Sequence, residues 1–155
     1  MVIDVARIEL ETRIAAPPER CFDFARDLDL HLRSMRHTGE HAVDGRTSGL
    51  IEFGEEVTWR ARHFGFELEH TSRITAFDRP KHFRDSMVSG RFQTFEHDHF
   101  FELESGTTLM RDVLEFESPF GILGAVVDEL VLVGYLTRLL KERNRAIKAD
   151  AEKHR

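Results

Sequence analysis

Six turn signals divide residues 40–117 into short segments, and this spacing constrains the fold more than any other feature. The signals are Asp44-Gly45-Arg46, Ser48-Gly49, Phe64-Gly65, Asp78-Arg79-Pro80, Ser89-Gly90 and Ser105-Gly106. The segments between them alternate apolar and polar residues, as strands do. Connections this short join antiparallel neighbours, because a parallel crossover needs a dozen or more residues. We therefore expect about six antiparallel strands in this region.

The segments on either side of this region predict one further strand and three helices. Residues 6–14 alternate in polarity, which predicts a strand with Ile8, Leu10, Thr12 and Ile14 facing inward. The pattern then changes to a helical period, with Pro17 and Pro18 opening a short helix and a second short helix near Leu30 to Met35. After Glu117, Ser118 is a suitable N-cap and Pro119 a suitable first helical residue. From there to about Lys153 the chain predicts one long helix.

This order of elements predicts a single α+β domain over residues 1–155. A sheet of about seven antiparallel strands, with two short helices after the first strand, has only one long helix to cover its apolar face. The sheet must therefore curve around the C-terminal helix, in a helix-grip arrangement. A curved sheet seldom closes perfectly on a helix, so we expect a cavity between them.

Two hairpins have two-residue turns, which determine the residues that lie opposite each other. Around Ser105-Gly106 the predicted pairs are Leu103 with Thr108, Phe101 with Met110, His99 with Asp112, His97 with Leu114, and Phe95 with Phe116. Around Phe64-Gly65 they are His63 with Phe66, Ala61 with Leu68, Trp59 with His70, and Val57 with Ser72. These pairs form one mostly apolar face in each hairpin, and the charged residues fall on the other. The histidines are therefore predicted to point inward.

The hairpin around Ser89-Gly90 does not keep this alternation. Phe83, Met87 and Phe92 fall on one phase, whereas Phe95 and the residues after it fall on the other. A β-bulge between Phe92 and Phe95 would bring both sets onto the inner face. In that case Asp85 also faces inward and becomes a second acid near the histidines.

Composition and charge exclude several classes of function. The formal net charge is −6, and its 22 basic and 28 acidic residues are interspersed, so no nucleic-acid partner is expected. A single cysteine, Cys21, excludes a disulfide framework and a thiolate zinc site; with an N-terminus that lacks an apolar signal core, it predicts a cytoplasmic protein. The apolar stretch 120–140 carries Asp128 and Glu129 near its middle, which a membrane span disfavours. It is predicted to be a helix on the sheet, wide enough in its apolar face to allow a homodimer.

Three segments carry a resemblance to a known family. They are IAAPPERCFDFARD at 14–27, ITAFDRPKHFRDSMVSGRFQTFEHDHFFE at 74–102 and MRDVLEFESPFGILG at 110–124. The chain resembles the START-like, helix-grip superfamily, and within it the bacterial polyketide cyclase/dehydrase-like proteins called SRPBCC. The resemblance extends over nearly the whole chain and implies a deep pocket for a small hydrophobic or amphipathic molecule. The superfamily includes lipid and hormone binders, coenzyme Q-binding proteins and aromatase/cyclases, so it leaves the ligand open.

The predicted ligand-binding residues lie on the inner face of the sheet. They are Trp59, His70, Phe95, His97, His99, Phe101, Met110, Asp112 and Phe116. In the alternative hypothesis the protein is a cyclase or dehydratase acting on a polyketide-like carbonyl substrate, in which Asp112 orients His99 as a general acid/base. Binding alone is favoured, because buried polar pairs commonly do no more than satisfy each other. A third hypothesis is a scaffold that binds a protein partner weakly through the same cavity.

Other polar residues receive less specific predictions. His97 faces Leu114 and has no predicted protein partner, so it is the histidine expected to be free for a ligand. His97 and His99, with His63, His70 and Asp112, are of metal-binding type, but spacing does not show convergence on one point, so neither a metal nor another cofactor is predicted. The exposed arginines Arg84 and Arg91 are expected to be solvated. The same is expected of the basic residues of the last helix, which are Arg138, Lys141, Arg143, Arg145 and Lys148.

Overall fold

The computed structural model describes residues 5–118 and 131–153. The strands are β1 (Ala6–Ile14), β2 (His41–Gly45), β3 (Glu56–His63), β4 (Phe66–Asp78), β5 (His82–Ser89), β6 (Thr94–Glu104) and β7 (Thr107–Glu117). The helices are α1 (Pro18–Ala25), α2 (Leu28–Ser34), the 3-10 turn η1 (Arg36–Thr38) and α4 (Val133–Lys153). The predicted helix start at Pro119, and Asp128 and Glu129 of the apolar stretch, lie outside the described residues.

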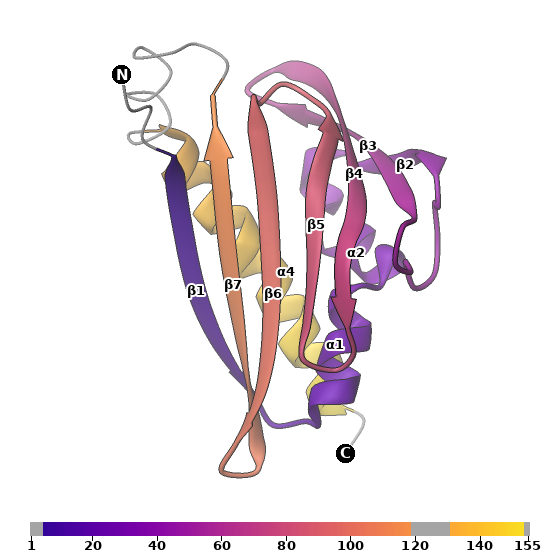
Figure 1. Ribbon diagram of the computed structural model, residues 1–155. Helices are drawn as coiled ribbons and strands as arrows, with labels where there is room; N and C mark the ends of the chain where they lie inside the picture. The colour runs from indigo at the N-terminus through magenta and orange to yellow at the C-terminus, as the bar shows by residue number, and fades with distance from the viewer. Residues whose placement is uncertain (1–4, 119–130, 154–155) are drawn as a thin grey trace.

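The seven strands form one antiparallel sheet, in the order β1-β7-β6-β5-β4-β3-β2. The N-terminal strand β1 therefore forms one edge of the sheet, next to the last strand, β7. The sheet curves, and α4 lies across its inner face with α1 and α2 beside it, as Figure 1 shows. This is the predicted helix-grip architecture. No helix in the described ranges combines the length and the apolar character that a membrane crossing requires.

The two tight hairpins have the predicted register. In both turns the two central residues have positive φ: 52° and 79° at Phe64 and Gly65, and 49° and 80° at Ser105 and Gly106. Two consecutive residues with positive φ give the twist that suits a two-residue hairpin. All nine predicted pairs, including His99 opposite Asp112, are present in the ladders.

The connection between β5 and β6 differs from the prediction in one respect. Asp85 lies opposite His97 and Ser86 opposite Glu96, in a register without a bulge. The chain changes phase in the loop after β5, at residues 90–93, because a loop outside the ladder can absorb extra residues without breaking hydrogen bonds between strands. The predicted bulge is therefore wrong, but its consequence holds, and Asp85 points to the inner face.

Helix α1 begins at the predicted prolines and docks onto the sheet through one aromatic side chain, whereas α2 spans Leu28–Ser34 and begins two residues before the predicted Leu30. Proline occupies the start of α1, and the carboxylate of Asp27 caps α2 by accepting hydrogen bonds from the backbone N–H groups of Asp29 and Leu30. Phe22 of α1 is fully buried. Its ring meets those of Phe77, Phe83 and Phe101 edge-on, at centroid distances of 5.2, 5.2 and 5.3 Å. Burying such a ring stabilises the fold by about 2 kcal/mol, so Phe22 anchors α1 on the sheet.

The outer face of the sheet carries the charged residues, as alternation predicts. Arg60 pairs with Glu69, Arg7 with Glu115, and Arg84 with Asp98. Side chains of alternating strand residues point to opposite faces, so these ion pairs leave the inner face to apolar side chains and to a small number of polar ones.

Candidate functional site

A buried polar cluster lies between strands β5–β7 and helix α4. Its members are Asp85, His97, His99, Asp112, Arg143 and Asn144. Four come from three adjacent strands and two from the middle of α4. The cluster therefore exists only because the helix packs across the sheet.

Asp112 is the centre of this cluster and is completely buried. Its Oδ1 accepts a hydrogen bond from Nε2 of His97 at 2.8 Å, and its Oδ2 accepts one from Nδ2 of Asn144 at 2.7 Å. Nη1 of Arg143 lies 3.7 Å from Oδ1. Burial alone would raise the pKa of Asp112, but hydrogen bonding to His97 and the proximity of His99 outweigh it and hold that pKa well below its usual range. The side chain is therefore an ionised carboxylate that accepts hydrogen bonds.

His99 lies between two carboxylates. Its Nε2 is 2.9 Å from Oδ2 of Asp85, in a hydrogen bond. Its Nδ1 is 3.1 Å from Oδ1 of Asp112, which is close enough for electrostatic attraction, but the atoms are not aligned for a hydrogen bond. Burial opposes the charged imidazolium, yet Asp112 and Asp85 together raise the pKa of His99 above its usual value.

The pKa values of His97 and Asp85 are both lowered, whereas that of His99 is raised. The ring of His97 stacks on that of His99, with centroids 3.8 Å apart. Burial and the charge of His99 lower the pKa of His97, so its ring is neutral. Burial would raise the pKa of Asp85, but the hydrogen bond to His99 and the nearby histidines lower it to about 2. The cluster thus holds two ionised acids, one neutral histidine and one histidine that favours a proton.

The hydrogen-bond partners differ from those predicted for the two histidines. The register predicts that His99 pairs with Asp112 and that His97 has no protein partner. His97 instead donates to Asp112, and His99 bonds to Asp85. The reason is that the Asp112 side chain leans diagonally along the ladder toward His97, although His99 is its direct neighbour in the register.

A cavity of about 100 Å³ adjoins the cluster, bounded by α1, α2, the inner faces of β3–β6 and α4. Three predicted ligand-binding residues line it: Trp59, His97 and His99. Asp85 and Ser72 add polar groups, and apolar walls come from Val57, Ile74, Phe83 and Leu140. A volume of this size is smaller than the roughly 300–1,000 Å³ of most ligand pockets. The described residues therefore enclose a smaller pocket than the deep one that the family resemblance implied.

The other six predicted ligand-binding residues do not line this cavity. Phe95 and Phe116 belong to a second apolar core with Leu114 and Leu140, and His70 packs on the ring of Phe95 at 4.9 Å. Phe101 and Met110 belong to the main core, and Asp112 lies behind the histidines. The physical reason is that the apolar residues of this set on β6 and β7 pack directly onto other apolar side chains, whereas the cavity lies under β3–β5 and under His97 and His99 of β6. Phe101 also borders an open surface groove near Pro17 and Leu103, away from the cluster.

Helix α4 contributes two residues that sequence analysis missed. Arg143 was predicted to be solvated, but only 6% of it is exposed, and its Nη2 donates to the backbone oxygen of Ala25 at 2.8 Å. Asn144 is also buried. A helical period was available as a signal, because Leu140, Arg143, Ile147 and Ala151 lie on one face of the helix and all are buried. The long run of charged residues concealed it.

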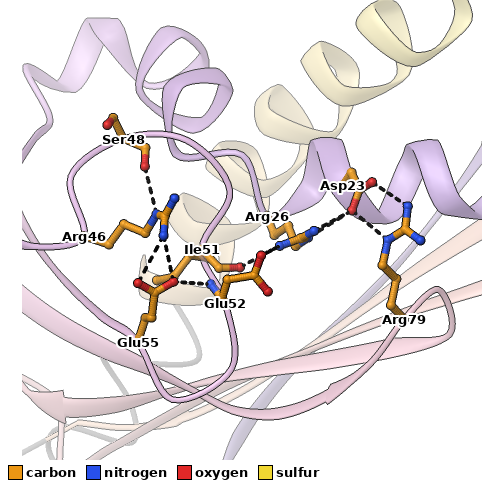
Figure 2. A network of polar contacts seen from close by, with 8 residues as sticks. All are labelled: Asp23, Arg26, Arg46, Ser48, Ile51, Glu52, Glu55 and Arg79. Carbon is orange, nitrogen blue, oxygen red and sulfur yellow. Dashed lines mark hydrogen bonds and ion pairs between the residues drawn. The ribbon is translucent and has the colours of Figure 1, made fainter.

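Arg26 lies at another side of the cavity and is fixed by a polar network, shown in Figure 2. It donates to Asp23, to Glu52 and to the backbone oxygen of Ile51. Asp23 also receives two hydrogen bonds from Arg79. Burial would raise the pKa of Asp23, but these arginines hold it below its usual range. The charge of Arg26 is therefore already compensated, which leaves the Asp85–His97–His99 side as the polar end of the cavity.

Comparison with known proteins identifies the fold. No protein-family model and no curated protein matches the chain. Solved structures match over nearly the whole length. The Zhui aromatase/cyclase from Streptomyces sp. R1128 has a TM-score of 0.74 at 15% identity and covers 97% of this chain and 95% of its own. A START superfamily protein from Mycobacterium smegmatis has a TM-score of 0.69 at 14% identity, covering 95% and 97%.

A third similar structure is TTHA0849 from Thermus thermophilus, with a TM-score of 0.72 at 22% identity, covering 94% of this chain and 99% of its own. Identities this low establish the fold and not an activity. The chain therefore has the START-like helix-grip fold, as the resemblance of its sequence predicted.

Proposed function

We propose that this protein binds a small amphipathic molecule in the cavity between the sheet and α4, with the polar end of the ligand against Asp85 and His97. The observation that carries the proposal is the arrangement of the cavity, in which apolar walls meet two hydrogen-bond acceptors. Asp85 is ionised, and the neutral His97 ring donates through Nε2 to Asp112, which leaves Nδ1 as an acceptor. An apolar site with few polar groups that fix orientation is the usual form of a small-molecule site.

The acceptors define the polar group of the ligand. A hydroxyl, phenol or enol can donate a hydrogen bond to Asp85 or to Nδ1 of His97. A carboxylate has no proton to donate and is repelled by Asp85 and Asp112. Arg143 does not change this preference, because its guanidinium is already engaged by the Ala25 carbonyl and lies near Asp112. We therefore propose an alcohol-type ligand and not a fatty acid.

The size of the cavity limits what it holds without movement. About 100 Å³ corresponds to roughly three water molecules, or to a ligand of a few heavy atoms. Trp59 and His31 both line the cavity and are partly exposed, and their rings pack against each other in a tilted arrangement with centroids 4.4 Å apart, so they form its outer wall. A larger ligand would have to displace this pair, with only its hydroxyl end in the present cavity.

Trp59 gives a direct test, because it is the only tryptophan in the chain and lies in the cavity wall. We expect 1-butanol to change its fluorescence saturably and butyrate to have no such effect. Ser72→Leu should fill the cavity and abolish the response, whereas Thr75→Leu, on the outer face of the same strand, should retain it. Native mass spectrometry of the purified protein should also detect a carried-over ligand. An equal response to butyrate, or a full response in Ser72→Leu, would contradict the proposal.

A second candidate function is acid/base catalysis, and one observation favours it. His99 lines the cavity, is hydrogen bonded to Asp85 and favours its protonated form. An imidazolium held in this way can act as a general acid toward a bound carbonyl compound, as a cyclase or dehydratase requires. Asp112 would then be a positioning residue and not a catalytic one, because it does not reach the cavity. In this case His99→Gln would lose nearly all turnover of a candidate polyketone, while a simple binder would lose about tenfold or less in affinity.

The proposal also includes the cellular location of the protein and the kind of partner that it binds. The single cysteine is buried and free, which suits a reducing compartment, and we propose a cytoplasmic location. The interspersed charges support a small-molecule partner and no nucleic-acid partner.

A further inference from the structure

Three metal-ligating side chains converge at the polar end of the cavity. One ligand atom from each of Asp85, His97 and His99 lies within 4.8 Å of the other two. Within residues 5–118 and 131–153 no other group of histidine, cysteine and acidic residues has this property. Spacing along the sequence gave no sign of such convergence. The fold supplies it, because Asp85 lies directly opposite His97 and His99 is the next residue on the same face of β6.

The distance between two of these residues suits ligands of one ion. Nε2 of His99 and Oδ2 of Asp85 are 2.9 Å apart. Two ligand atoms at right angles around an ion, each at about 2.1 Å, are separated by about 3.0 Å. An ion could therefore replace the shared proton of this hydrogen bond with little movement of either side chain.

The residues behind the histidines have the arrangement that metal-binding histidines usually need. Such a histidine donates the N–H that does not face the metal to a carboxylate, which fixes the ring and leaves the other nitrogen as a ligand. His97 donates in this way to Asp112, and no described residue forms a hydrogen bond with its Nδ1. Nδ1 of His99 lies 3.1 Å from the same carboxylate. Asn144 holds Asp112 in place from α4.

The local charges also have room for a cation. Asp85 and Asp112 contribute two negative charges and Arg143 one positive charge, while Arg26 across the cavity is paired with Asp23 and Glu52. The cluster thus has a net charge of about −1 when both histidines are neutral. A divalent ion with one anionic oxygen ligand, such as hydroxide or the deprotonated hydroxyl of a bound molecule, would bring it to neutrality.

We propose that Asp85, His97 and His99 bind one divalent first-row transition-metal ion, whose remaining coordination positions face the cavity. Two histidines and one carboxylate are a ligand set that binds metals of this class and leaves coordination positions of the ion open. The inference goes beyond the binding of an organic ligand and does not depend on it. If both hold, the metal is the partner of the ligand oxygen.

The test uses Co²⁺, whose visible absorption reports coordination by nitrogen and oxygen ligands. Chelator-treated wild-type protein should bind one equivalent of Co²⁺ saturably. Asp85→Asn keeps the shape of the side chain but weakens it as a ligand, and we expect it to lower the affinity more than about 10-fold. The matched control is Asp98→Asn, on the same pair of strands, where Asp98 contacts His82 on the outer face. This variant should bind Co²⁺ like the wild type.

A second variant keeps the test decisive if Asp85→Asn does not fold. His97→Gln should lose affinity to a similar degree, with circular dichroism reporting the fold in each case. The proposal is overturned if wild-type protein gives no saturable Co²⁺ spectrum, or if Asp85→Asn and Asp98→Asn bind equally well. Native mass spectrometry of metal-free protein tests the organic ligand separately, so failure of the metal site leaves that proposal standing, and the reverse also holds.

Discussion

His97 donates a hydrogen bond to Asp112 across a diagonal of the β6–β7 ladder, although its direct neighbour in the register is Leu114. Both side chains are buried, at 7% and 0% exposure. The bond joins the cavity wall to α4, because Asp112 is also held by Asn144 of that helix. Sheet, helix and candidate site are thus connected through one carboxylate.

The first prediction concerns that carboxylate. Asp112→Asn should lower the free energy of unfolding by about 3 kcal/mol, because it removes a buried charge and leaves Arg143 without its counter-charge. The control is Glu115→Gln on the outer face, where an exposed ion pair with Arg7 contributes about 0–1 kcal/mol. Urea unfolding of both variants measures the difference. Equal losses in the two variants would show that Asp112 is not the centre of the cluster.

Arg143 gives a second prediction, on the helix side of the cluster. Arg143→Met should cost about 3 kcal/mol, because Asp112 loses the positive charge that α4 supplies and the Ala25 carbonyl loses its donor. Arg145→Met, two residues further along α4 and exposed, should change stability by less than about 0.5 kcal/mol. Thermal or urea unfolding distinguishes them. A negligible effect of Arg143→Met would restore the solvated role predicted from the sequence.

A third prediction is a pH dependence at Glu40. Burial opposes ionisation of Glu40, but His31, at 3.2 Å from its Oε2, holds the pKa below the ordinary value of 4.5. A carboxyl group with a lowered pKa in the folded state stabilises the protein above its unfolded pKa and loses that contribution as the pH falls through the folded pKa. Wild type should therefore exceed Glu40→Gln in stability by about 1–2 kcal/mol at pH 7, with the gap closing below pH 4.5.

Unfolding curves of the Glu40 pair at pH 7, 5 and 3 provide the measurement. A gap that stays constant from pH 7 to pH 3 would mean that ionised Glu40 contributes nothing through His31. Glu69→Gln on the outer face is a suitable control for general acid effects, because Glu69 is exposed and pairs with Arg60.

Gly45 gives a fourth prediction, at the edge of the sheet. Gly45 and Gly39 both have positive φ, at 72° and 66°. A Cβ at Gly45 would lie 2.3 Å from the backbone oxygen of Glu56, whereas a Cβ at Gly39 would have no neighbour within 4 Å. Gly39→Ala should therefore cost about 1 kcal/mol from backbone strain alone. Gly45→Ala should cost at least about 1 kcal/mol more, because a backbone clash is added.

The comparison of these two glycine variants by urea unfolding separates strain from steric clash. If Gly45→Ala is no worse than Gly39→Ala, then the β2–β3 pairing gives way without loss of stability.

The register of the hairpins was predictable because it is local. Two-residue turns determine which residues face each other, and alternation determines which of them point inward, so His97, His99 and Asp112 were placed on one face correctly. The failed detail, the bulge before Phe95, was also local, but a loop and a bulge shift the phase equally and the sequence does not distinguish them.

The candidate site depended on contacts between distant segments. Turn chemistry and side-chain periodicity were enough to predict the helix-grip order of elements, the inner face and its two histidines. They could not show that Asp112 bonds to His97, that Asp85 bonds to His99, or that Arg143 is buried beside them, and the folded structure settles all three. It also places the cavity under β3–β5 and the two histidines of β6, and not under β7. Hydrogen-bond partners and cavities depend on how the helix packs across the curved sheet, and that packing brings together residues far apart in the chain, such as Lys148 and Arg13, which are 135 positions apart.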